Sequence, residues 1–311
     1  KFKKRGNFFH AFLFVCKIKI MKALNTLAIF LLLAIAATAQ NQKDTTYWNV
    51  SGQASLNFSQ VSFSHWVAGG RNSVSGVGLF NINANYEKAK IHWDNAFRSG
   101  YGLLKEQENE VTKTDDKLEL NSKLGVETNN EHLLYSSFLN FSTQFANGYN
   151  YPDTENEISG FLAPAYLTVA AGFDYQPSDK FSLFATPLSG KFTFVTSEEL
   201  SSQGAFGVKP GEKARAEVGA TVKSELKTQV VENVDMTTTL SLFSNYLDHP
   251  ENIDVKWDLI LNMKINDYLS ANFITNLVYD HDILVPLKNS DRRRRRVQLK
   301  QLLGVGLSYK F

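Results

Sequence analysis

The residues best suited to chemistry form two short clusters in the last third of the sequence. Asp280-His281-Asp282 places two carboxylates beside an imidazole, a combination that could bind a metal ion or activate a water molecule. A hydrolase would also need a nucleophile next to the imidazole and a third group to orient it. The sequence contains no G-x-S-x-G pattern, so we interpret the cluster as a solvated loop and predict no catalytic residue, metal site or cofactor.

The second cluster is a run of five arginines that follows Asn289-Ser290-Asp291: Arg292, Arg293, Arg294, Arg295 and Arg296. Guanidinium groups bind phosphates through paired hydrogen bonds, so this run could form a phosphate-binding site. A solvated arginine loop is an equally good interpretation. Nucleic acid is a poor candidate, because no aromatic residues are interleaved with the arginines and the formal net charge is only +2.

Alternation of apolar and polar residues with a period of two follows the chain from Gln40 to its last residue, and predicts β-strands. Near the C-terminus, Leu303, Val305, Leu307 and Tyr309 share one face of such a strand. These strands exceed the length of about five or six residues that is usual in globular sheets. The pattern predicts twelve strands, at residues 48–63, 73–88, 90–104, 115–129, 132–146, 159–175, 180–195, 213–230, 234–247, 252–265, 268–282 and 297–311.

The segments between these strands alternate between short turns and long polar loops. The short turns lie at residues 88–90, 129–131, 176–179, 231–233 and 266–267. The longer loops lie at residues 64–72, 105–114, 147–158, 196–212, 248–251 and 283–296. Bacterial outer-membrane barrels have short periplasmic turns and longer extracellular loops. We therefore predict an all-β fold, a transmembrane antiparallel up-and-down β-barrel of about twelve strands with both termini in the periplasm.

The composition agrees with a barrel. A mean hydropathy of −0.24 excludes a bundle of transmembrane helices, but not a barrel, whose lipid-facing residues alternate with polar ones. Tyrosine and tryptophan residues recur near the predicted strand ends, as expected of aromatic belts at the membrane surfaces. The single cysteine excludes a disulfide framework.

The N-terminal residues predict export through a cleavable signal peptide. Met21-Lys22 begins a basic segment, Leu27–Ala36 is apolar, and Ala37-Thr38-Ala39 supplies the small residues that signal peptidase requires. We interpret residues 1–20 as upstream translation and residues 21–39 as the signal peptide. Residues 40–47 are then a periplasmic segment and residues 48–311 the barrel.

The polar faces of the predicted strands carry charges of both signs. These charges could pair across the lumen, because isolated charges in a narrow barrel are costly, or they could line a weakly selective pore. They form no ring of a single sign that would select one ion. The predicted lumen residues are His92, Asp94, Arg98, Glu119, Lys123, Glu127, Arg215, Glu217, Lys223, Glu225, Asp254, Lys256, Asp258 and Lys264.

The loop after the first predicted strand contains Trp66, Gly69 and Gly70. Paired glycines permit tight turns, so this loop could fold inward as a constriction. An ordinary glycine turn with an interfacial tryptophan is an equal alternative.

The C-terminal LGVGLSYKF resembles the terminal strand signal of outer-membrane barrels, with apolar Leu307, Tyr309 and Phe311 two residues apart. The chain from Gln40 onward resembles an uncharacterised Bacteroidota family of outer-membrane β-barrels, known only as a domain of unknown function. Ser64–Ser73 (SHWVAGGRNS) is the segment that carries this second resemblance. The resemblance implies an outer-membrane location and recognition by the barrel-assembly machinery during biogenesis, but no activity.

These observations predict a non-enzymatic outer-membrane barrel. It would be either a narrow channel for small polar solutes or a structural partner in an envelope complex. On this topology the arginine run lies on the extracellular rim, at the height of the phosphates of lipopolysaccharide. The alternative is a membrane-embedded hydrolase of the outer-membrane lipase or protease type.

Overall fold

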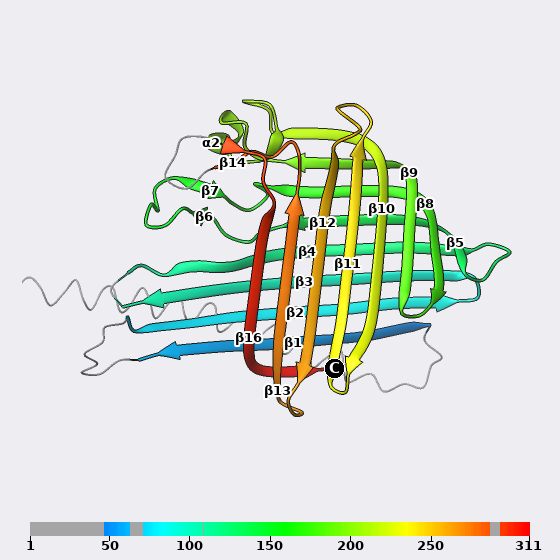
Figure 1. The fold of residues 1–311 in the computed structure, drawn as a ribbon, viewed down its shortest axis with the longest axis horizontal. Coiled ribbons are helices and arrows are strands. Elements are labelled where there is room, and N and C mark those ends of the chain that lie inside the picture. The colour runs from blue at the N-terminus through cyan, green and yellow to red at the C-terminus, as the bar shows by residue number, and fades with distance from the viewer. Residues whose placement is uncertain (1–46, 63–70, 108, 287–292) are drawn as a thin grey trace, which may run out of the picture. The chain divides into compact units, whose positions relative to one another are not determined.

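The computed structural model describes residues 47–62, 71–107, 109–286 and 293–311, in which twelve long strands form one closed antiparallel barrel (Figure 1). The predicted all-β barrel of twelve strands is confirmed. Each long strand pairs with the next one in the chain, and β16 closes the barrel against β1. The barrel strands are β1 (Trp48–Val61), β2 (Ser73–Lys88), β3 (Ile91–Glu106), β4 (Thr112–Glu127), β5 (Leu133–Thr143), β8 (Ala165–Ser178), β9 (Phe181–Phe194), β10 (Ala214–Val231), β11 (Val234–Asn245), β12 (Ile253–Lys264), β13 (Leu269–Tyr279) and β16 (Gln298–Lys310).

The largest difference from the predicted strands concerns β8. The sequence pattern predicts a strand from residue 159, whereas β8 begins at Ala165. Pro164 has no N–H group to donate to a ladder, which explains why regular pairing starts only after it. Ala163, which lies within the predicted strand 159–175, is instead buried in a small core with three residues of the next long loop: Val195, Leu200 and Val208.

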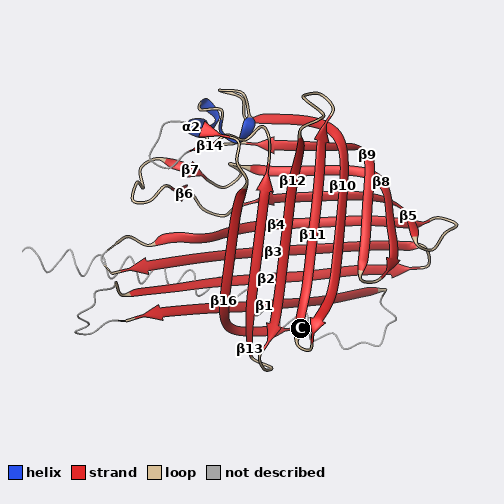
Figure 2. Ribbon diagram, viewed as in Figure 1, coloured by secondary structure: helices blue, strands red, loops and turns tan. Residues whose placement is uncertain are grey.

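The two ends of the barrel differ in the length of their connections (Figure 2). Residues 89–90, 128–132, 179–180, 232–233 and 265–268 connect strands at one end, which we call the turn end. The other end, the loop end, carries β6 (Gly148–Tyr149), β7 (Glu157–Ser159), α2 (Glu198–Ser202), η1 (Ala205–Gly207), β14 (Val285–Pro286) and β15 (Arg293–Arg294). No helix within the described ranges is both long and apolar enough to cross a membrane.

Both ends of the barrel sequence lie at the turn end, where Gly52 N donates a hydrogen bond of 2.8 Å to Phe311 O. Aromatic rings gather there on the outside of the wall. The ring of Trp48 lies 5.2 Å from that of Tyr86 and 5.5 Å from that of Trp93, measured between centroids. This cluster matches the aromatic belt expected where a barrel wall meets a membrane surface.

The outward faces of the strands are apolar. Leu303 on β16 is 71% exposed, Leu188 on β9 is 63% exposed and Phe58 on β1 is 61% exposed. Exposed leucine, valine and phenylalanine side chains recur on strands around the barrel, which gives its outer wall a continuous apolar character. A wall of this kind is suited to hydrocarbon rather than to water.

Candidate functional site

The candidate site is the lumen, which an ion pair crosses from wall to wall. Strands β4 and β12 lie on opposite sides of the barrel, because five strands separate them in either direction. Lys256 Nζ on β12 nevertheless lies 3.3 Å from Glu119 Oε1 on β4. Since this contact is possible only through the interior, it defines the inward face of both strands.

Further polar contacts surround this pair in the middle of the lumen. Glu119 also lies 2.8 Å from Lys117 Nζ and accepts a hydrogen bond of 3.2 Å from Asn140 Nδ2 of β5. Lys256 Nζ lies 3.8 Å from Asp258, which accepts a hydrogen bond of 2.5 Å from Asn276. The mixed charges therefore neutralise one another locally, rather than presenting one sign to a passing solute.

A second network lies toward the loop end and centres on Lys191 of β9. Its Nζ lies 2.7 Å from Asp254, 2.9 Å from Asp280 and 3.7 Å from Glu217. Arg215 pairs with Glu217 at 2.8 Å and also with Asp282. Lys191 was not among the predicted lumen residues, although Ser189, Lys191 and Thr193 alternate with Phe192 and Phe194 and so indicate a polar face.

This network accounts for the acidic cluster around His281. Asp280 forms an ion pair with Lys191, and Asp282 forms one with Arg215. His281 Nδ1 lies 3.2 Å from Tyr279 Oη. Within the described ranges no three or more His, Cys, Asp or Glu residues are placed to hold a metal ion. The carboxylates thus serve as ion-pair partners in the lumen.

Toward the turn end the lumen contains apolar packing that the sequence analysis did not anticipate. Phe138, Ala170 and Phe184 form a buried cluster, with the two phenylalanine rings 6.0 Å apart. Lys223 Nζ lies 4.2 Å from the centroid of the Phe138 ring, a cation–π geometry. Leu134, which is 2% exposed, lies at the turn end of β5.

The remaining predicted lumen residues occupy the following places. Lys123 pairs with Asp174 at 2.6 Å, and His92 Nε2 lies 2.9 Å from Glu127. Asp94 and Arg98 on β3 are the register partners of Lys123 and Glu119. Glu225 pairs with Lys227 at 2.6 Å, whereas Lys264 ends β12 and pairs with Asp267 in the turn.

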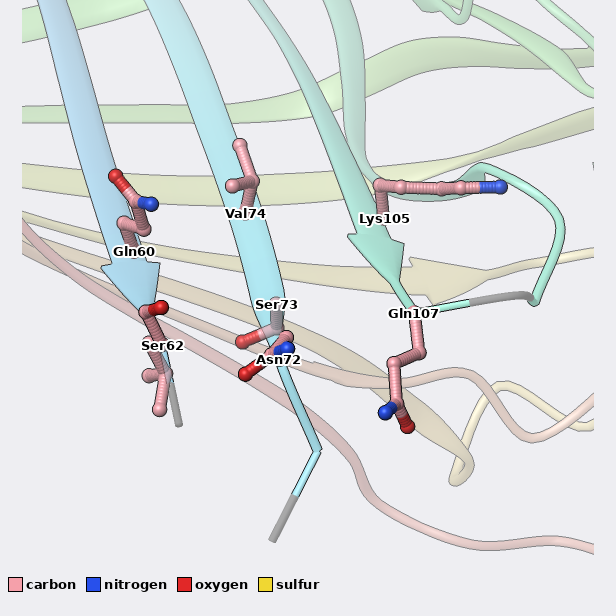
Figure 3. Close-up of a pocket in the computed structure, with 8 residues that line it drawn as sticks. Gln60, Ser62, Asn72, Ser73, Val74, Lys105 and Gln107 are labelled. Atoms are coloured by element: carbon pink, nitrogen blue, oxygen red, sulfur yellow. The ribbon is translucent and has the colours of Figure 1, made fainter. Parts of the chain in front are cut away.

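A cavity of about 220 Å³ lies in the loop half of the lumen, between the walls that carry β4 and β12. Lys117, Tyr166, Lys256 and Asn276 are among the residues that line it. A second hollow, of about 290 Å³, lies at the loop end of β1, β2 and β3, where Figure 3 shows its polar residues. It is lined by Gln60, Val61, Ser62, Asn72, Ser73, Val74, Lys105 and Gln107.

Several predictions concern residues or side chains outside the described part of the structure: the signal peptide, the predicted constriction at Trp66, Gly69 and Gly70, and the side chains of Arg292 and Arg293. The described part of the arginine run is at the loop end. The side chains of Arg294, Arg295 and Arg296 are exposed, and Arg295 Nε donates a hydrogen bond of 2.7 Å to His281 O.

A family model described as "Protein of unknown function (DUF3078)" matches residues 58–149, from the end of β1 to β6. No curated protein matches the sequence.

Among solved structures, the chain is similar to the translocator domain of the autotransporter NalP from Neisseria meningitidis. The TM-score is 0.35 at 9% identity, over 94% of this chain and 98% of that chain. An outer membrane channel from Pseudomonas putida F1 gives a TM-score of 0.40 at 11% identity, over 88% of this chain and 98% of the channel chain. A porin gives a TM-score of 0.28 at 10% identity, over 85% of this chain and 100% of the porin chain. TM-scores this low carry no argument about location or activity.

Proposed function

We propose that the chain is a non-enzymatic outer-membrane β-barrel, with a narrow polar lumen that passes small solutes only when its central ion pair opens. The observation that carries the proposal is the Lys256–Glu119 pair, which joins opposite walls inside the barrel. The apolar outer wall and the aromatic cluster at the turn end support the membrane location.

The strand number suits a restricted passage. Barrels of about eight strands are filled by side chains, and those of about sixteen or more hold an aqueous channel. Twelve strands lie between these limits, so the side chains decide whether the lumen conducts. Here the cavity in the loop half is bounded by Lys256 of the central ion pair and by Lys117 and Asp258, which also take part in the charge network.

The experiment is to measure single-channel conductance in planar bilayers for the wild type and for the double variant Glu119→Gln/Lys256→Met. Changing both partners avoids leaving one buried charge unpaired. We expect low or intermittent conductance for the wild type and a larger conductance for the variant. The matched control is Glu198→Gln/Lys213→Met, which removes an exposed loop pair with a distance of 3.4 Å and should leave conductance unchanged. Absence of conductance in both the wild type and the Glu119→Gln/Lys256→Met variant would contradict a channel and would favour a structural role in an envelope complex.

We further propose that the loop end faces the outside and that both termini lie in the periplasm. The length difference between the connections supports this orientation. On this orientation the exposed arginines Arg294, Arg295 and Arg296 reach the height of lipopolysaccharide phosphates. Lipopolysaccharide is accordingly the proposed partner of the arginine run.

A membrane-embedded hydrolase is less well supported than a channel. His281 contacts Tyr279, and the exposed His249 lies 3.0 Å from Glu251. This contact raises the pKa of His249, because the carboxylate of Glu251 stabilises the protonated imidazole. Ester or peptide hydrolysis by the purified barrel that is lost in His281→Ala would reverse this preference.

A further inference from the structure

The barrel wall is incompletely paired at one seam, between β1 and β16. β1 pairs with β2 along its whole length, and β13 pairs with β16 from Leu269↔Leu307 to Val278↔Gln298. By contrast, β1 and β16 pair only from Gln53↔Lys310 to Asn57↔Gly306. Among the described residues, no strand pairs with the facing edges of residues 58–61 and 298–305. In Figure 1, β16 (red) follows β1 (blue) only near its C-terminal end and then turns away.

Two glycines of β16 lie where this pairing ends. A Cβ atom on Gly306 would lie 2.1 Å from the carbonyl oxygen of Leu56, and one on Gly304 would lie 2.6 Å from Asn57 Nδ2. The atom that obstructs Gly306 belongs to the backbone, so only glycine allows the two strands to approach so closely at that position. The close contact pins β16 against β1 on the turn side of the unpaired segment.

The inner side of the seam gathers buried polar atoms that make no hydrogen bond within the protein. They are Asn57 Nδ2 and Oδ1, Ser270 Oγ and Asn272 Nδ2. Asn272 and Ser270 are the register partners of Gly304 and Gly306, so these groups surround the two glycines. Asn57 is 4% exposed and Asn272 is 2% exposed. Unpaired buried amides are costly and rare, and together these groups offer uncharged donors and acceptors to a ligand.

Apolar side chains continue from this polar group along the inner wall. Lys300 reaches Asp115 on β4 and therefore points inward, as does Leu302 two residues later. Ile274 is the register partner of Leu302. On the other side of the seam, Val61 lies on the same face of β1 as the buried Asn57, at the position that would face Leu302 if the register continued. The strip of inner surface between the polar atoms and the Lys300–Asp115 pair thus suits a hydrocarbon chain better than a polar solute.

We propose that the unpaired half of the β1–β16 seam is a lateral opening that admits a single-chain amphiphile with an uncharged, hydrogen-bonding head group, such as a monoacylglycerol. The acyl chain enters between β1 and β16 and lies against Val61, Ile274 and Leu302. The head group pairs with the amides of Asn57 and Asn272 and with Ser270. The ion pair of Lys300 and Asp115 joins β16 to β4 behind the gap and limits its width. This inference rests on the proposed membrane location.

The test uses a monoacylglycerol with a diazirine in its acyl chain, added to phosphatidylcholine vesicles that contain the barrel. Labelled residues are identified by mass spectrometry after illumination. The variant Phe58→Cys/Val305→Cys places cysteines at the next positions in register and can close the gap by a disulfide. Leu56→Cys/Leu307→Cys is the matched control, because these residues are already paired. Residues 47–311 contain no other cysteine.

We expect the probe to label the inward-facing Ile274 and Leu302 and also the outward-facing Leu303. Oxidation of the first variant should abolish labelling of Ile274 and Leu302, reduction should restore it, and the control should keep it in both states. If the first disulfide does not form, the double variant Asn57→Leu/Asn272→Leu provides the second test, since loss of the polar site should also abolish inward labelling.

The possible failures are distinguishable. Labelling of Leu303 without Ile274 or Leu302 in the wild type would overturn the lateral opening and leave the membrane location intact. Absence of labelling at all three residues would overturn the membrane location. If a lysophosphatidic acid probe labels Ile274 and Leu302 as strongly as the monoacylglycerol probe does, the proposal that the head group must be uncharged is overturned. Crosslinks between two copies of the chain through residues 58–61 would show that strand pairing between copies fills the seam instead.

Discussion

The two halves of the lumen are closed by different interactions. In the loop half, Lys191 and Arg215 share several carboxylates next to a cavity of about 220 Å³. In the turn half, Phe138, Ala170 and Phe184 form an apolar cluster, and the Lys223 ammonium lies over the Phe138 ring. Ion pairs beside a cavity can exchange their partners for water, whereas apolar packing can open only by leaving a void. The loop half is therefore built as a vestibule, and the apolar cluster of the turn half forms a second barrier behind the Lys256–Glu119 pair.

The strongest test of this contrast removes the apolar packing. Phe184→Ala should lower the free energy of unfolding by about 3–5 kcal/mol, because it deletes a buried ring and leaves a cavity. Denaturant titration in phospholipid vesicles measures this change, and a larger conductance should accompany it. Phe173→Ala is the matched control, since Phe173 is 47% exposed on the outer wall and lipid can fill the space. Equal losses in the two variants would mean that the packing in the lumen does not differ from that on the outer wall.

The second prediction concerns the vestibule. Lys191→Met leaves Asp254, Asp280 and Glu217 close together without their shared cation. We expect the free energy of unfolding to fall by about 3 kcal/mol, which is the lower end of the range for a broken buried ion pair. The lower end applies because water reaches the neighbouring cavity. The same titration measures this change. Lys213→Met removes an exposed pair with Glu198 and should cost about 1 kcal/mol or less. If Lys191→Met loses no more stability than this control variant, the ion-pair network is solvated and contributes little to the free energy of unfolding.

The sequence predicted the wall better than the contents of the lumen, for a physical reason. Outward positions such as Leu303 and Val305 must all be apolar, so each strand shows an alternation of apolar and polar residues that the sequence alone reveals. Inward positions obey no such rule, and the apolar Phe138 and Phe184 gave no signal that they fill a lumen. The Lys256–Glu119 contact joins residues 137 apart in the chain. Its existence depends on the stagger of opposite strands, which a repeating pattern does not encode.

The same distinction explains the seam between β1 and β16. The alternation around Leu303 predicts a strand there, and β16 confirms it. How far its edge pairs with β1 depends on the backbone contacts of Gly304 and Gly306, which only the three-dimensional arrangement reveals.

The smallest expected effect concerns the rim outside the vestibule. Replacing the five arginines 292–296 with glutamine keeps the loop polar and removes its charge. Because the outer wall and both lumen halves are untouched, stability should change by less than about 1 kcal/mol. Phosphate that co-purifies with the barrel as lipopolysaccharide at low salt should fall, and in the wild type added salt should weaken the contact, since screening acts over about 10 Å at 0.1 M.

This last prediction requires the loop end to face outward, which cysteine labelling on intact cells tests separately. Ser202→Cys on the exposed side of α2 should react with an impermeant reagent, and Ser178→Cys at the turn end should not. The neighbouring Ser201 is unsuitable for this test because it is only 3% exposed. Lys209→Gln/Lys213→Gln serves as the control for general loss of charge at the same end. If the arginine variant and this control retain the same phosphate as the wild type while Ser202 is labelled, the arginine run is a solvated loop. If only the arginine variant loses phosphate, the rim of the vestibule carries a phosphate site that is independent of the lumen.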